Sequence, residues 1–189
     1  MTRIQLLGIP GSLRAGSFST AILESLREEL APGADLILHP LGDVPLYNQD
    51  LDTEIALPGV KALRDAIAQA DGLVIVTPEF NYGMPGVLKN ALDWASRPYG
   101  AAPLIGKPVV TISASPAFTG GVRAQAQLNE TLLATQSRLI GGPQVVIGEV
   151  HNKITDGRLT DRASLDFALG AVSGLVETIE EAIRHLRAA

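Results

Sequence analysis

Short runs of apolar residues alternate along the chain with longer segments in which apolar residues recur every three or four positions. The apolar runs predict strands buried on both faces, and the periodic segments predict amphipathic helices. The expected strands cover residues 4–9, 34–41, 72–76, 108–113 and 144–150. The expected helices cover residues 19–30, 60–70, 85–96, 121–139 and 165–186.

Five strands that alternate with five helices predict an α/β fold, in which helices cover both faces of a parallel sheet. Right-handed crossovers favour the doubly wound strand order 2-1-3-4-5. In that order a ligand sits beyond the carboxyl ends of the strands, near the switch point between the first and third strands. Because no linker or repeat interrupts the pattern, we expect residues 1–189 to form one domain.

The net charge of −5 argues against a nucleic acid or an anionic membrane as partner, because those surfaces require clustered lysine and arginine. The absence of cysteine excludes disulfides, thiol redox chemistry, iron–sulfur clusters and thiolate zinc sites. The three histidines have no ligand spacing, so no metal site is expected. The first apolar run breaks at Pro10, and no run reaches the length of a membrane span. We therefore expect a soluble, cytoplasmic protein.

The first strand leads into a loop, residues 10–19, that is rich in hydroxyl groups. It carries three serines and one arginine: Ser12, Ser17, Ser19 and Arg14. Hydroxyls, backbone N–H groups and the positive end of the next helix can donate to phosphate oxygens, and an arginine adds a charge-assisted contact. The loop has neither the dinucleotide fingerprint nor the P-loop lysine. Simple capping of the helix by serine and glycine is the alternative explanation.

The third strand leads into residues 78–85, PEFNYGMP. Gly83 permits close backbone approach, and the prolines end the strand and begin the helix. Phe80, Asn81 and Tyr82 are left without a structural reason. They could wall a flat ring and hydrogen-bond its edge, or the aromatic side chains could simply cover the end of the core.

The fourth strand leads into residues 113–121, which are small and rich in hydroxyls and glycine. Alone they could be an ordinary loop before a helix. Together, the three loops would offer one pocket with a phosphate cradle, an aromatic and amide wall, and a glycine loop for close approach. Such a pocket suits a mononucleotide with a flat ring, and flavin mononucleotide (FMN) fits best.

Three stretches, GSLRAGSFS, PEFNYGMPGVLKNALDW and SASPAFTGGVRAQ, together resemble the NAD(P)H-dependent FMN reductase family, which includes bacterial quinone, chromate and azo-dye reductases. The resemblance spans residues 4 to about 153 and implies a flavodoxin-like three-layer sandwich that binds FMN noncovalently. It also implies a homodimer or homotetramer in which a second subunit completes the site. Residues 44–50 are the candidate contact, and a surface loop on the monomer is the alternative.

The resemblance implies three groups of cofactor-binding residues. Those around the phosphate are Ser12, Arg14, Ser17, Phe18 and Ser19. Those along the isoalloxazine ring are Pro78, Glu79, Phe80, Asn81, Tyr82 and Gly83. Those near its far edge are Ser115 and Gly120. The chain departs from the family at three positions: Phe80 replaces a common tyrosine, Ser19 a common asparagine, and Ala117 a frequent glycine. These departures leave the phosphate site in place and could change substrate preference.

Because a flavin can carry the redox chemistry, no residue of the chain is expected to be catalytic in the strict sense. We expect hydride from NADPH or NADH to pass through FMN to a small-molecule acceptor (a quinone, an azo compound, chromate or free flavin) by ping-pong kinetics. Tyr82 and Arg14 are the expected substrate contacts. The alternatives are a flavodoxin-like single-electron carrier and a non-enzymatic FMN-binding module. Flavodoxins tend to be more acidic than this chain, and their loops differ from Asn-Tyr-Gly.

Overall fold

The computed structural model describes residues 3–188 and contains the expected parallel sheet. Its long strands are β1 (Ile4–Pro10), β2 (Ala34–Leu38), β3 (Gly72–Thr77) and β4 (Pro108–Ala114). The order is β2-β1-β3-β4-β5, and neighbouring strands are parallel, so the predicted order 2-1-3-4-5 is confirmed.

The fifth position of the sheet is divided between two short strands. β5 (Arg138–Leu139) pairs with the start of β4, and β6 (Val145–Ile147) pairs with its end. At the break, the buried side chain of Gln125 donates from Nε2 to the carbonyl oxygens of Thr111 (2.9 Å) and Val145 (3.3 Å). The predicted strand 144–150 is therefore too long, because the chain turns away at Glu149, whose φ is 51°.

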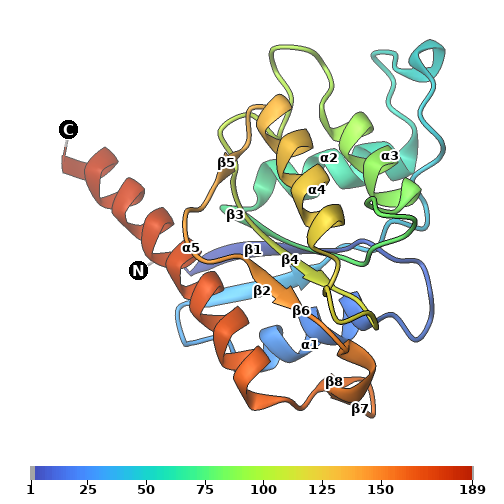
Figure 1. Cartoon of the computed structure of the whole chain (residues 1–189). Coiled ribbons are helices and arrows are strands. Elements are labelled where there is room, and N and C mark those ends of the chain that lie inside the picture. Colours follow the sequence, from blue (N-terminus) through green and yellow to red (C-terminus); the bar gives the residue numbers. More distant parts are fainter. Residues whose placement is uncertain (1–2, 189) are drawn as a thin grey trace.

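Helices cover both faces of the sheet (Figure 1). On one face lie α1 (Phe18–Glu29) and α5 (Arg162–Ala188). On the other lie α2 (Pro58–Gln69), α3 (Gly86–Ala95) and α4 (Val122–Ala134). Alternate strand residues point to opposite faces, so Val74 and Val76 pack under α1 and α5 whereas Leu73 and Ile75 pack under α2 to α4. The three-layer flavodoxin-like sandwich is confirmed.

The predicted helix 121–139 is wrong in its last turn. Helix α4 ends at Ala134, and Gln136 takes a left-handed conformation with φ of 62°. The buried hydroxyl of Ser137 donates to the carbonyl oxygen of Leu104, and the next residues join the sheet as β5. Tertiary pairing with β4 thus overrides helical periodicity at this point.

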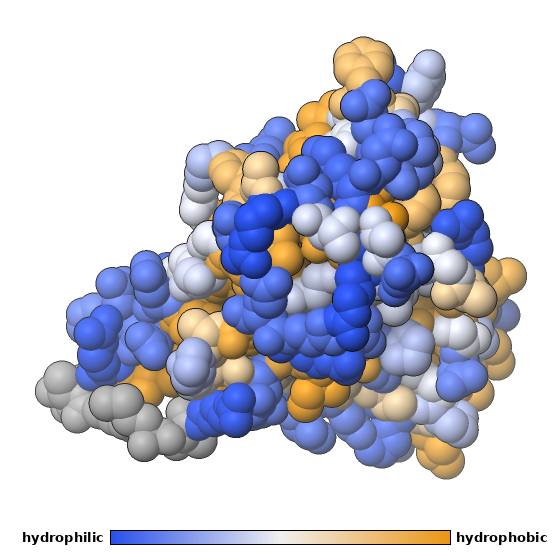
Figure 2. Space-filling model, turned by 90° about the horizontal axis from the view of Figure 1, so that it is seen from below, coloured by the Kyte–Doolittle hydropathy of each residue, from blue (hydrophilic) through white to orange (hydrophobic). Residues whose placement is uncertain are grey.

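Short elements that the pattern did not predict complete the fold. They are the single turns η1 (Gln49–Leu51) and η2 (Val150–Asn152) and the hairpin of β7 (Ile154–Thr155) and β8 (Arg158–Leu159). Seen from below, the surface is largely hydrophilic, with separated hydrophobic groups (Figure 2). Within residues 3–188, no helix is both long enough and apolar enough to cross a bilayer.

Candidate active site

The carboxyl ends of β1, β3 and β4 lie in register at one edge of the sheet. Pro10 pairs with Val76, and Thr77 pairs with Ser113. The N–H of Gly11 donates to the carbonyl oxygen of Val76 at 2.8 Å, so the loop after β1 begins directly against β3. The three loops that the sequence singled out therefore start side by side.

The loop after β1 ends in a helix terminus suited to an anion. Ser17 is buried and caps α1, its hydroxyl accepting from the N–H of Thr20 at 3.3 Å. In the described part of the chain, the N–H groups of Phe18 and Ser19 have no protein acceptor. Free N–H groups at the positive end of a helix favour a phosphate.

Arg14 lies folded back on its own loop. Its guanidinium donates to the carbonyl oxygen of Gly16 at 2.5 Å and lies 5.2 Å from the ring centre of Phe18. The hydroxyl of half-buried Ser12 accepts from the Arg14 N–H at 3.3 Å. Arg14 is exposed, so its side chain can turn toward a phosphate at the N-terminus of α1. It would then give up its hydrogen bond to the carbonyl oxygen of Gly16.

The loop after β3 contains a tight two-residue turn. Phe80 and Gly83 exchange two backbone hydrogen bonds of 3.0 Å, and the residues between them, Asn81 and Tyr82, have φ of 49° and 65°. Positive φ at both central residues is the type I′ geometry, which asparagine tolerates and tyrosine disfavours. The turn holds Phe80 and Tyr82 outward, with 57% and 71% of their surface exposed.

Two side chains fasten this turn to helix α4. Glu79 is half-buried, and its Oε2 accepts from the N–H groups of Arg123 and Ala124, each at 3.0 Å. Gln127, one helical turn further, accepts from the N–H of Met84 at 2.8 Å. The turn is consequently braced from both ends by the first two turns of one helix.

Arg123 also contacts the turn with its side chain. Its guanidinium carbon lies 4.1 Å from the ring centre of Tyr82, a cation–π distance. Both residues are exposed, so this stacked pair stands at the open edge of the site.

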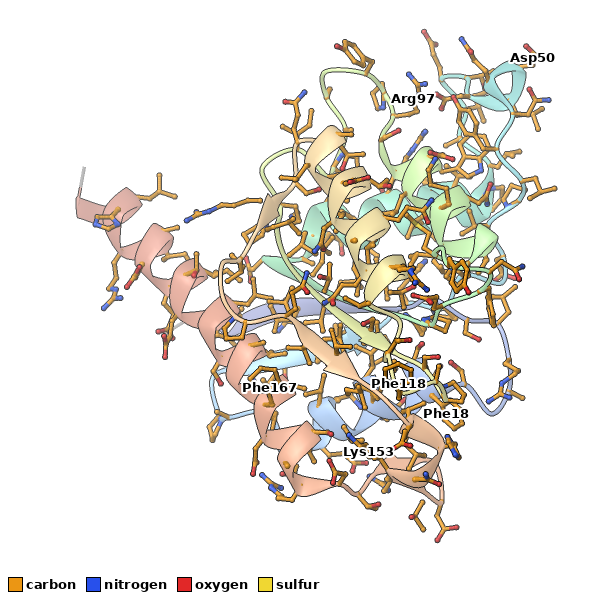
Figure 3. The ribbon with its side chains drawn as sticks, in the orientation of Figure 1. Phe18, Asp50, Arg97, Phe118, Lys153 and Phe167 are labelled. Atoms are coloured by element: carbon orange, nitrogen blue, oxygen red, sulfur yellow. The ribbon has the colours of Figure 1, made fainter. Side chains whose placement is uncertain are left out.

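The loop after β4 packs against the segment that follows β6. The buried Ser115 donates its N–H to the carbonyl oxygen of Ile147 at 3.1 Å. Gly120 has φ of 63°, and a Cβ there would lie 2.4 Å from a methyl group of Val146. The close approach at this glycine is therefore to the chain itself. Phe118, labelled in Figure 3, extends from the same loop and is 85% exposed.

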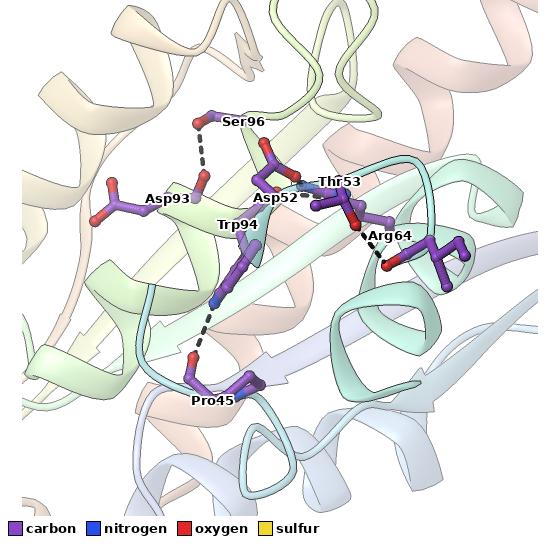
Figure 4. A network of polar contacts seen from close by, with 8 residues as sticks. Pro45, Asp52, Thr53, Arg64, Asp93, Trp94 and Ser96 are labelled. Atoms are coloured by element: carbon purple, nitrogen blue, oxygen red, sulfur yellow. Dashed lines mark hydrogen bonds and ion pairs between the residues drawn. The ribbon is translucent and has the colours of Figure 1, made fainter. Parts of the chain in front are cut away.

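The irregular segment that carries residues 44–50 is pinned by helix α3. The carbonyl oxygen of Pro45 accepts from the side chains of Asn90 and Trp94, both at 2.8 Å, and Asn90 accepts from the N–H of Tyr47 at 2.7 Å. Figure 4 shows the Trp94 contact. The second half of the PEFNYGMPGVLKNALDW stretch thus positions this segment, a role the sequence did not reveal.

Sequence reasoning also missed Arg123 and Gln127. They lie four residues apart on one face of α4, the helix that follows the glycine pair. A hollow of about 480 Å³ lies elsewhere, at the break between β5 and β6, and none of its lining residues comes from the three loops. In the described chain, no three histidine or carboxylate side chains gather as metal ligands.

Comparison with known proteins places this architecture among flavin-dependent reductases. The NADPH-dependent FMN reductase family matches residues 4–152. The NAD(P)H-dependent FMN reductase of Pseudomonas aeruginosa is 38% identical over 185 residues, 97% of each chain. The quinone reductase of Escherichia coli K12 is 38% identical over 94% of this chain and 96% of its own. The structure of FerB, a flavoenzyme NAD(P)H:(acceptor) oxidoreductase from Paracoccus denitrificans, is 34% identical with a TM-score of 0.80, covering 94% of this chain and 98% of FerB.

Proposed function

The chain belongs to the NADPH-dependent FMN reductase family, and from that membership we propose that it is a cytoplasmic, FMN-dependent reductase of quinones. NAD(P)H, one proton and a quinone would become NAD(P)⁺ and a hydroquinone. The nicotinamide supplies hydride, which carries two electrons, and solvent supplies the proton. The observation that carries the proposal is the alignment of the loops after β1, β3 and β4 at one edge of the sheet.

The residues of the first loop fit a phosphate. The hydroxyls of Ser12, Ser17 and Ser19 and the free N–H groups at the start of α1 would surround its oxygens, while Arg14 would balance its charge. Phe18 would pack beside the phosphate site under the arginine. FMN, held there, would supply the hydride-transfer chemistry.

The second and third loops would hold the ring. Phe80, Asn81 and Tyr82 would form its wall, with Pro78 and Gly83 shaping the backbone there. Glu79 would act indirectly, because its carboxylate already binds the start of α4. Ser115 and Gly120 would fix the loop that meets the far edge of the ring.

Quinones are the preferred acceptors in this proposal because the relatives favour them. Quinone reductases of Escherichia coli and Pseudomonas putida and a 2-hydroxy-1,4-benzoquinone reductase of a Burkholderia species are 36–38% identical to this chain. The exposed aromatic side chains Phe80 and Tyr82 also suit a planar acceptor. Azo compounds, chromate and free flavin are the other acceptors to test, with NADPH and NADH as alternative donors.

We further propose that two copies associate through the irregular segment around residues 44–50, as a homodimer or within a homotetramer. Leu46 and Ile55 expose 83% and 87% of their surface, and Tyr99 exposes 88%. Arg97 lies 5.9 Å from the Tyr47 ring, which brings the loop that carries Tyr99 beside this segment. Asp50 and Arg97 stand at the same end of the molecule in Figure 3. If these side chains form one contiguous apolar patch, they would be suited to contact a second copy.

The deciding experiment mixes purified, FMN-loaded protein with NADPH under anaerobic conditions in a stopped-flow instrument. Flavin absorbance should bleach within seconds and return when a quinone is added. Bleaching over hours would instead favour the single-electron carrier. A colourless protein without affinity for FMN would favour the non-enzymatic module.

A mutation tests the phosphate site separately. Arg14→Ala should weaken FMN binding by about 1.5–3 kcal/mol, the range for a hydrogen bond to a charged group. The matched control is Arg138→Ala, since Arg138 is exposed and pairs with the opposite, amino end of β4. Unchanged FMN affinity in Arg14→Ala would show that the phosphate binds elsewhere.

A further inference from the structure

The side chain of Arg123 has an aromatic partner but no carboxylate. In the described chain its guanidinium makes no ion pair and no hydrogen bond, and it lies 4.1 Å above the Tyr82 ring. The carboxylate of Glu79 accepts from the backbone N–H of Arg123 and not from its side chain. The guanidinium of this exposed residue therefore has donors available for a ligand at the edge of the site.

Arg123 stands at a helix terminus whose positive end the Glu79 carboxylate already offsets in part. Arg123 lies in the first turn of α4, and a positive charge near a helix N-terminus costs about 0.3–1 kcal/mol. Its stacking partner, Tyr82, is held at φ of 65°, which non-glycine residues rarely adopt. The strained backbone of Tyr82 at this exposed contact indicates that the stacked pair has a functional role.

We propose that Arg123, stacked on Tyr82, binds a phosphate group of the reduced nicotinamide dinucleotide and so determines specificity for the hydride donor. This inference rests on the proposed reductase function. Stacking on the ring fixes the guanidinium plane and leaves its edge free for bidentate contact with phosphate oxygens. The dinucleotide is strongly anionic, and the chain carries a net charge of −5, so a local cation is needed to draw it in.

In this proposal Arg14 and Arg123 bind different phosphates: Arg14 that of FMN, and Arg123 one of the dinucleotide. Arg14 stands beside the start of α1, where the free N–H groups form the cradle proposed for the FMN phosphate. Arg123 stands over the turn after β3, next to the aromatic wall proposed for the ring. A donor whose nicotinamide lies against the ring held by that wall would bring its phosphates toward Arg123.

The test compares Arg123→Gln with the matched control Arg138→Gln, which removes the same charge at the opposite end of β4. Reduction of the FMN-loaded protein is followed anaerobically with two donors, NADPH and N-benzyl-1,4-dihydronicotinamide, which has no phosphate. Arg123→Gln should raise the NADPH concentration for half-maximal rate by about tenfold and leave the benzyl donor unaffected. Arg123→Lys should recover only part of the loss, because lysine keeps the charge without the planar fork.

A binding measurement gives a second readout. Isothermal titration of FMN-loaded protein with tetrahydro-NADPH, which cannot transfer hydride, should show the same tenfold loss for Arg123→Gln. Added salt should weaken binding to the wild type more steeply than to the variant, because screening acts on the lost contact.

Three outcomes would overturn the proposal. Equal losses with both donors would mean that the arginine merely orders Tyr82. Unchanged NADPH kinetics, together with slower reoxidation by a sulfonated azo dye, would assign Arg123 to an anionic acceptor. Unchanged affinity for tetrahydro-NADPH would show that no phosphate is bound. If the wild type reacts with neither donor, the reductase function fails, and the titration still decides the role of the arginine.

Discussion

The Glu79 carboxylate caps helix α4, its Oε2 accepting a hydrogen bond of 3.0 Å from the N–H of Ala124. The two residues are 45 positions apart and belong to the segments after β3 and β4. A carboxylate at the positive end of a helix is stabilising, and it also fixes the two segments relative to each other. Glu79 is therefore a positioning residue for the wall that Phe80 to Tyr82 form.

Replacement of Glu79 should cost stability. Glu79→Ala removes two charge-assisted hydrogen bonds to α4, so the free energy of unfolding should fall by about 1–2 kcal/mol in urea denaturation. The matched control is Glu130→Ala, since Glu130 is exposed on the same helix, and it should change stability by less than about 0.5 kcal/mol. Equal stability of both variants would mean that the cap contributes nothing.

Gly120 should tolerate no side chain. Gly120→Ala forces alanine into φ of 63° and places its Cβ 2.4 Å from Val146 and 2.9 Å from the backbone nitrogen of Gly148. The combined strain and overpacking should lower the free energy of unfolding by about 3 kcal/mol, measured by urea denaturation. Gly100→Ala separates the two effects, because Gly100 has φ of 79° but open space around it. It should lose only about 1 kcal/mol, and a comparable loss at both sites would remove the packing argument.

The central strands could be predicted because short, continuous apolar runs of this kind are typical of strands buried on both faces. Residues 72–77 are apolar with a closing threonine, and all are buried under helices on both sides. The expected strand 144–150 contains β6 (Val145–Ile147), but the division of the fifth strand could not be predicted, since Arg138–Leu139 is too short to carry a pattern of its own. Only its pairing with β4 makes residues 138–139 a strand.

The candidate site also has a part that could be predicted from the sequence and a part that could not. Once the strand order is known, topology alone brings the three loops to one edge. The contacts among the three loops depend on backbone conformations that the sequence does not predict. Asparagine at position 81 suggests a positive φ, but tyrosine at position 82 does not. The stacking of Arg123 on Tyr82 follows from that conformation and was consequently missed.

His39 should make stability depend on pH. It follows β2, and its partial burial lowers the pKa from its usual value of 6.5, an effect that the nearby Asp43 carboxylate opposes. A depressed folded-state pKa means that the unfolded chain binds the proton more readily. The contribution of neutral His39 to the free energy of unfolding is therefore fully present above pH 6.5. It is lost as the pH falls through the folded-state pKa.

The measurement is the free energy of unfolding from about pH 8 to about pH 5. His39→Gln should show a shallower decline on the acid side than the wild type. His151→Gln, which replaces an exposed histidine, is the matched control and should follow the wild-type curve. Parallel curves for the wild type and His39→Gln would assign the acid decline to other groups.

The ion pair of Arg64 with Asp52 should hold the irregular segment in place. The two side chains are only 15% and 17% exposed, their nearest atoms are 2.7 Å apart, and Arg64 also donates to the carbonyl oxygen of Trp94 at 2.9 Å (Figure 4). Arg64→Met leaves the largely buried Asp52 carboxylate without a partner, so the free energy of unfolding should fall by about 2 kcal/mol. Amide exchange in residues 44–52 should also accelerate, because the segment loses its link to α2.

The exposed pair of Lys61 with Asp65 on α2 provides the control, since Lys61→Met removes a cation whose side chain is 66% exposed. Exposed pairs contribute little, so this variant should lose no more than about 0.5 kcal/mol and leave exchange in residues 44–52 unchanged. Adding Asp52→Asn to Arg64→Met should restore part of the loss, because the desolvated carboxylate is then neutral. If the double variant is no more stable than Arg64→Met alone, the cost comes from the Trp94 contact and not from the ion pair.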